Sequence, residues 1–132
     1  LSLGLYLDGS LDAQALELAL NDIVDRHEPL RTCFPDPYAL KPREEAAVMR
    51  RLRDPDVLGR VLFELRIDSD ARLAIETRAA APGQDESEAV RDFVREATAV
   101  PFRYDRAPLM RASLMALRPD RHLLLLVVDH LV

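Results

Sequence analysis

The stretch HLLLLVVDH, residues 122–130, decides the fold. Its central residues are apolar at odd and even positions alike, and side chains alternate between the two faces of a strand. A strand that is apolar on both faces belongs in the middle of a sheet that is covered on both sides. The same alternation predicts that His130 lies on the face of the even-numbered residues, and that Asp129 lies on the opposite face.

Two segments upstream of this strand have apolar residues at helical spacing. The first begins at the capping residue Asp12 and ends near His27, because Pro29 disfavours helical geometry at the residue before it. The second begins at Asp85, and Glu88 three residues later completes a capping box. We therefore expect two amphipathic helices that pack on the sheet.

Alternating or wholly apolar runs predict strands at residues 1–7, 30–34, 61–67, 73–77, 109–117 and 122–129. The turn DSDA is expected to join 61–67 and 73–77 into a hairpin, and the turn RPDR joins the last two strands. A basic helix is expected at 43–53. Because hairpins outnumber crossover units, this order predicts an α/β protein, a two-layer sandwich with a mixed, largely antiparallel sheet.

The composition of the 132 residues limits the classes of function. A hydrophobic share of 48% can build one buried core, and a formal net charge of −5 argues against a nonspecific nucleic-acid binder. The single cysteine excludes an internal disulfide framework. Without a long apolar run or a signal peptide, we expect a soluble cytoplasmic protein. The start at Leu1 without a methionine suggests a piece of a larger polypeptide.

His130 is the candidate for chemistry, because a histidine at the end of a buried strand combines an apolar wall with an open side. Most histidines in that position are merely hydrogen-bonded, so both interpretations stand at this point. His122 lies eight strand steps away, roughly 26 Å at about 3.3 Å per step, and cannot share a metal ion with it. His27, at a helix end, adds no metal-ligand spacing. Cys33 follows a strand pattern, which is typical of a small core residue.

Three separated blocks of the chain resemble the condensation domains of nonribosomal peptide synthetases. The first block resembles the pattern RHExLRTxF and matches it at Arg26, His27, Glu28, Leu30, Arg31, Thr32 and Phe34. The second resembles the connector and strand before the active site, with matches at Pro101, Phe102, Pro108, Leu109, Arg111 and Leu114. The third, HLLLLVVDHLV, is similar to the strand that leads into the family's HHxxxDG motif.

The third block places Asp129 at the first histidine of that motif and His130 at the second, which the resemblance makes the catalytic residue. The chain departs from the pattern at Asp129 and ends before the motif's Asp and Gly. The resemblance implies that the motif is supported by Asp129, Arg26, His27, Glu28, Arg31 and Arg111. We expect both Arg31 and Arg111 to be structural, pairing with carboxylates such as that of the motif Asp.

The resemblance also implies a chloramphenicol acetyltransferase-like fold, with two lobes and a reaction tunnel between them. Residues 1–132 would be a partial N-terminal lobe, with 36–60 as an insertion or a join. It implies no tightly bound cofactor, with the substrates tethered through the phosphopantetheine of carrier proteins, and the histidine spacing predicts no metal site. The expected partners are acyl or peptidyl carrier proteins and the remaining lobe, without nucleic acid or membrane.

The implied reaction is acyl transfer from a carrier-protein thioester to an amine in bacterial natural-product biosynthesis, with this fragment inactive alone. A second hypothesis keeps the fold and forms an ester with an alcohol acceptor, which the loss of the first histidine favours. A third is a degenerate, non-catalytic domain that recruits a partner protein. Within the enzyme hypotheses, His130 accepts a proton or only orients the nucleophile, and the sequence leaves both roles open.

Overall fold

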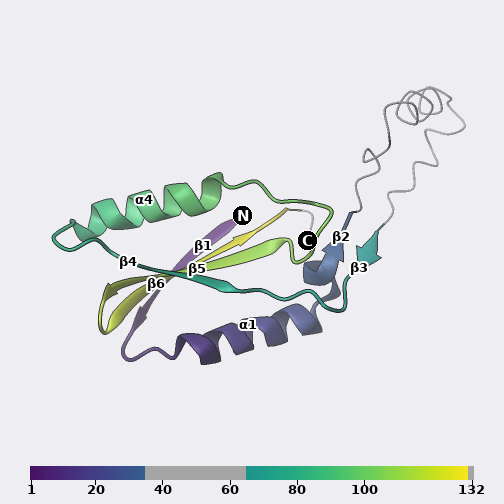
Figure 1. Cartoon of the computed structure of the whole chain (residues 1–132), viewed down its shortest axis with the longest axis horizontal. Helices are drawn as coiled ribbons and strands as arrows, with labels where there is room; N and C mark the ends of the chain where they lie inside the picture. The colour runs from purple at the N-terminus through teal and green to yellow at the C-terminus, as the bar shows by residue number, and fades with distance from the viewer. Residues whose placement is uncertain (35–64, 131–132) are drawn as a thin grey trace, which may run out of the picture.

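The computed structural model describes residues 1–34 and 65–130, and its main element is a four-stranded sheet (Figure 1). In spatial order the strands are β1 (Ser2–Asp8), β6 (Arg121–Val128), β5 (Met110–Arg118) and β4 (Ile75–Ala79). β6 pairs antiparallel with β1 and β5, whereas β4 pairs parallel with β5. The sheet is therefore mixed and largely antiparallel, and the doubly apolar stretch lies inside it, as the sequence predicts.

A helix covers each face of this sheet (Figure 1). On one face, Leu20 of α1 (Ala13–Arg26) shares a core with Leu124 of β6. On the other, Phe93 of α4 (Glu86–Ala99) shares a core with Leu125. The alternation predicted for β6 is confirmed, since its even-numbered residues face α1 and its odd-numbered residues face α4. The described part thus has three layers instead of the expected two, because a strand that is apolar on both faces needs cover on both.

Both helices begin at the aspartates that the sequence predicts. Asp12 accepts hydrogen bonds from the N–H groups of the second and third residues of α1, both at 3.0 Å. Asp85 accepts the equivalent pair from α4 at 3.0 and 3.2 Å. At the other end of α1, the N–H of His27 donates to the carbonyl oxygen of Ile23 at 3.1 Å. Local capping therefore sets where these helices start.

A second, two-stranded sheet follows α1. The chain first forms a short 3-10 helix, η1 (Glu28–Arg31), and then β2 (Thr32–Cys33), which pairs antiparallel with β3 (Arg66–Ile67). The strand expected at 30–34 is accordingly shorter, and Cys33 is fully buried, as expected for a core residue. The basic helix at 43–53, the segment 36–60 and the first part of the strand at 61–67 lie outside the described residues.

The hairpin expected between 61–67 and 73–77 is wrong, because β3 pairs with β2 and β4 pairs with β5. Side chains of α1 explain the difference. The Asn21 amide donates to the carbonyl oxygen of Leu73 at 2.8 Å and accepts from its N–H at 2.9 Å. Glu17 accepts from the N–H of Ile75 at 2.8 Å. These bonds hold the first residue of β4 and the segment before it against α1, and no spacing within this part of the chain encodes them.

Candidate active site

An open hollow of about 390 Å³ lies where β6 ends, beside the C-terminal end of α4. The N-terminus, the end of α4, the connector after it, β5 and residues 127–130 all contribute to its wall. The lining residues are Leu1, Thr98, Val100, Pro101, Phe102, Tyr104, Arg111, Val127, Val128, Asp129 and His130. The hollow therefore brings together three of the residues that the sequence singles out, namely His130, Asp129 and Arg111.

His130 is exposed and borders this hollow. β6 ends at Val128, so Asp129 and His130 follow the strand instead of extending it. The alternation of a strand no longer applies to them. Asp129 and His130 were expected on opposite faces, yet both line the same hollow.

Asp129 is held through its main chain and its side chain. Its N–H donates to the carbonyl oxygen of Leu109 at 2.9 Å, and its Oδ2 accepts a hydrogen bond from the Tyr104 hydroxyl at 3.1 Å. This hydrogen bond, together with the negative charge of the carboxylate, raises the pKa of the Tyr104 phenol above its ordinary value. Asp129 is thus anchored to the connector that follows α4.

Tyr104 lines this hollow, although no sequence pattern singles it out. It lies 25 residues before Asp129, in a connector without helical or strand periodicity. The signal that the sequence offers for Tyr104 is its place two residues after Phe102, and Phe102 is one of the residues that match the family pattern. Nothing in the local spacing indicates that its hydroxyl reaches the end of β6.

Arg111 fastens the end of α4 to β5. Its guanidinium donates to the carbonyl oxygens of Ala97, Val100 and Pro101 at 3.4, 2.6 and 3.2 Å. It also stacks over the ring of Phe102, 4.1 Å from the ring centre. The last carbonyls of a helix lack intrahelical donors, so a cation is favourable there. The described partners of Arg111 are carbonyl oxygens and an aromatic ring instead of the expected carboxylate, and its structural role stays a prediction.

Arg31 has a similar position at the end of α1, where its Nε donates to the carbonyl oxygen of Val24 at 3.2 Å. Arg26, His27 and Glu28 lie at the junction of α1 and η1, where all three are exposed. The lining of the hollow does not include these four residues. The structure therefore separates the RHExLRTxF block from the side chains around His130.

One main-chain contact nevertheless connects that block to the hollow. The N–H of Phe34, at the end of the block, donates to the carbonyl oxygen of Tyr104 at 2.6 Å. Phe34 follows β2 directly, so the contact joins the small sheet to the connector. The first block of the resemblance thus contributes to the position of the connector.

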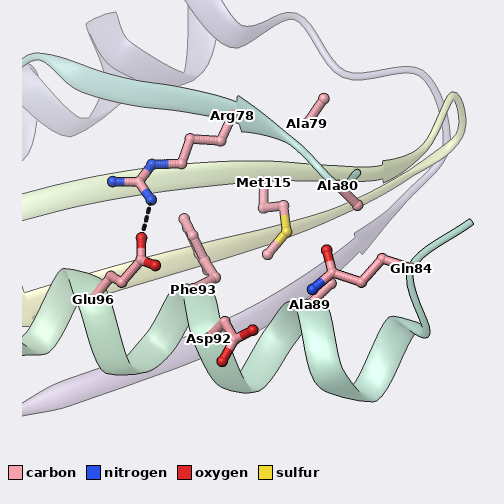
Figure 2. A pocket seen from close by; sticks show the side chains of 9 residues that line it. All are labelled: Arg78, Ala79, Ala80, Gln84, Ala89, Asp92, Phe93, Glu96 and Met115. Atoms are coloured by element: carbon pink, nitrogen blue, oxygen red, sulfur yellow. Dashed lines mark hydrogen bonds and ion pairs between the residues drawn. The ribbon is translucent and has the colours of Figure 1, made fainter. Parts of the chain in front are cut away.

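A smaller hollow of about 190 Å³ lies between β4, β5 and α4 (Figure 2). Its lining residues are Arg78, Ala79, Ala80, Gln84, Ala89, Asp92, Phe93, Glu96 and Met115. Figure 2 shows Glu96 paired with Arg78, and the other carboxylate, Asp92, pairs with Arg95. Exposed ion pairs of this kind contribute little free energy. With both carboxylates paired and an apolar floor, this hollow is a gap at the edge of the core.

Residues 1–34 and 65–130 contain no group of three or more His, Cys, Asp or Glu side chains placed to hold a metal ion. No helix in these two ranges is long and apolar enough to cross a membrane.

Comparison with known proteins gives relatives over nearly the whole chain, although no family model matches it. The chain is 35% identical over 127 residues to chondramide synthase cmdD of Chondromyces crocatus. It is 34% identical over 128 residues to a dimodular nonribosomal peptide synthase of Bacillus subtilis. Both matches cover 96% of this chain, but only 3% and 4% of those proteins. The chain therefore spans a small part of the curated relatives it matches.

Solved structures identify which part of such proteins the chain matches. An X-domain from teicoplanin biosynthesis superposes with a TM-score of 0.70 at 27% identity, covering 99% of this chain and 23% of that one. A condensation domain that mediates chain release from the enacyloxin polyketide synthase gives 0.65 at 26% identity, covering 98% and 22%. The chain belongs to the condensation-domain family of nonribosomal peptide synthetases. The resemblance of the three blocks is thereby confirmed.

This condensation-type chain has the fold that the resemblance implies. Its mixed α/β architecture matches the chloramphenicol acetyltransferase-like fold of those neighbours. SgcC5 of Streptomyces globisporus, solved with a naphthyl ethanediol and sucrose, also superposes, with a TM-score of 0.68 at 25% identity. That match covers 98% of this chain and 25% of SgcC5. The condensation-type segment described here therefore corresponds to about a quarter of each solved neighbour.

Proposed function

We propose that the domain containing this chain transfers an acyl group from a carrier-protein thioester to an amine, forming an amide. The observation that carries the proposal is the position of His130, exposed at the rim of an open hollow where the central strand ends. Its match to the second histidine of the family motif supports the same role. The acyl group arrives on the phosphopantetheine arm of a carrier protein, and the remaining lobe closes the hollow.

His130 handles the proton of this reaction. The amine nitrogen attacks the thioester carbonyl carbon, the carbon–sulfur bond breaks, and the thiolate of the phosphopantetheine arm leaves. The amine loses one proton and the thiolate gains one, so a single imidazole can accept the first and deliver the second. An α-amine has a pKa of about 7.7 to 8.0, so a fair share is neutral near pH 7 and a strong base is not required.

The test is turnover by the complete protein carrying His130→Ala. We expect product formation to fall by at least about a hundredfold, the usual range for loss of an acid–base group, with the fold intact by circular dichroism. His122→Gln is the matched control, because His122 lies near the start of β6, opposite Leu7 and away from the lining of the hollow. Turnover by His130→Ala at the wild-type rate would overturn the proposal.

Ester formation is the second candidate, and one observation favours it. SgcC5, which shares this fold, was solved with a diol bound. An alcohol acceptor needs the same proton transfer from a hydroxyl group instead of an amine. Matched amine and alcohol acceptors, offered with one acyl-thioester donor, distinguish the two reactions. Exclusive ester formation would replace the amide assignment while keeping the role of His130.

Recruitment of a partner protein is the third candidate. An X-domain from teicoplanin biosynthesis, 27% identical to this chain, was solved in complex with OxyB. The carboxylate of Asp129 at the position of the motif's first histidine fits a domain that has lost catalysis. This candidate predicts no turnover by the wild-type protein and unchanged partner binding after His130→Ala. Acyl transfer that depends on His130 would exclude it.

A further inference from the structure

The hydrogen bond between Tyr104 and Asp129 is a part of the hollow that the proposed reaction does not use. Asp129 directly precedes His130, and both residues line the hollow together with Tyr104. The Tyr104 hydroxyl donates to Oδ2 of Asp129 at 3.1 Å. The Tyr104 hydroxyl therefore binds the residue that directly precedes His130.

The two ends of this hydrogen bond are fixed by separate parts of the fold. On one side, the main chain of Asp129 is bonded to Leu109, 2.9 Å from N to O. On the other, the carbonyl oxygen of Tyr104 accepts from the N–H of Phe34 at 2.6 Å. The hydrogen bond between the Tyr104 hydroxyl and the Asp129 carboxylate thus links the end of β6 to the connector, which is itself bonded to the residue after β2.

The turn around Tyr104 is also held in place. Its neighbours Arg103 and Asp105 form a two-pronged pair, with nitrogen–oxygen distances of 3.2 and 2.8 Å. A bidentate arginine–carboxylate pair restricts orientation as well as distance. The hydroxyl of Tyr104 is consequently presented to Asp129 from a turn with a defined shape.

We propose that Tyr104 is a positioning residue for His130, acting through the carboxylate of Asp129. His130 follows the end of β6 and is exposed, so the ladder of the sheet does not orient it. Among the described residues, the anchoring of Asp129 restrains the backbone that leads into His130. This inference rests on the proposed function of His130, and it gives the aspartate at the first-histidine position a task in this chain.

A purely structural role for the hydroxyl predicts that Tyr104→Phe changes stability and leaves kcat per folded molecule unchanged. Tyr104 is 46% exposed, so removal of its hydroxyl should change the melting temperature little. A small displacement of a catalytic group, in contrast, can lower a rate many-fold. The positioning role therefore appears in kcat and leaves substrate binding and stability nearly unchanged.

The experiment is a double-mutant cycle in the complete protein with Tyr104→Phe, Asp129→Ala and the double variant. We expect Tyr104→Phe to lower kcat about tenfold with KM nearly unchanged. Because the hydroxyl acts through Asp129, it should have no further effect once Asp129 is alanine. Tyr6→Phe is the matched control, since the Tyr6 ring stacks on Arg121 away from the hollow and phenylalanine keeps that contact.

The outcomes separate this inference from the function on which it rests. Additive effects of the two substitutions, or an unchanged kcat in Tyr104→Phe, would overturn the positioning role if His130→Ala is inactive. Full turnover by His130→Ala would overturn the proposed function itself. If Tyr104→Phe folds poorly, Asp129→Asn decides the question, because its amide oxygen keeps an acceptor for the hydroxyl and should retain more activity than Asp129→Ala.

Discussion

Tyr104 and Asp129 form a pair whose strength depends on pH. The carboxylate accepts the hydrogen bond of the phenol, and a phenolate beside it would bring two negative charges together, so the pKa of Tyr104 is raised. A group with a raised pKa stabilises the fold below its unfolded pKa, about 10 for tyrosine. The contribution of this pair to stability is therefore fully present below about pH 10. It is lost as the pH rises through the higher pKa that Tyr104 has in the folded state.

Asp129→Asn tests this at the scale of one residue. The asparagine oxygen still accepts the hydrogen bond, but the negative charge is gone, so the pKa of Tyr104 should fall toward its ordinary value. Tyrosines labelled at the ring carbon that bears the hydroxyl report the titration by NMR, and Tyr104→Phe assigns the signal. An identical Tyr104 titration in wild type and Asp129→Asn would contradict the contact.

At the scale of elements, α1 is hydrogen-bonded to the main chain just before β4. Asn21 makes both a donor and an acceptor bond to the main chain of Leu73, which is buried at 4% exposure. Asn21→Ala leaves both Leu73 groups without that partner, which should lower the free energy of unfolding by about 2 kcal/mol. Denaturant unfolding of the complete domain measures the loss. Leu18→Ala, on the exposed side of α1 at 63%, is the control and should change stability by less than about 0.5 kcal/mol.

The same contact explains which features the sequence could predict. The caps at Asp12 and Asp85 and the two faces of β6 depend on residues a few positions apart, so the local pattern contains them. The segment before β4, in contrast, is bonded to Asn21, 52 residues before Leu73. The hydrogen bond to the Asp129 carboxylate comes from Tyr104, and the spacing of residues along the sequence does not predict this contact either. Predictions therefore failed where side chains of distant segments meet.

At the scale of the whole molecule, β6 joins the two cores. Leu124 packs with α1 and Leu125 packs with α4, at 4% and 2% exposure. The strand then ends at the hollow with His130. One strand therefore packs against both cores and leads directly to the candidate catalytic group, which follows the end of the strand.

This separation predicts that packing and chemistry can be lost independently. Leu124→Ala and Leu125→Ala should each lower the free energy of unfolding by about 2 to 5 kcal/mol, because each leaves a cavity in a different core. Their kcat per folded molecule should stay within about twofold of wild type, unlike His130→Ala. Denaturant unfolding and turnover, corrected for the folded fraction, measure both quantities in the complete domain. An unchanged free energy of unfolding after either substitution would mean that β6 is not packed on that face. The position of His130 at the end of a strand covered on both faces would then be wrong as well.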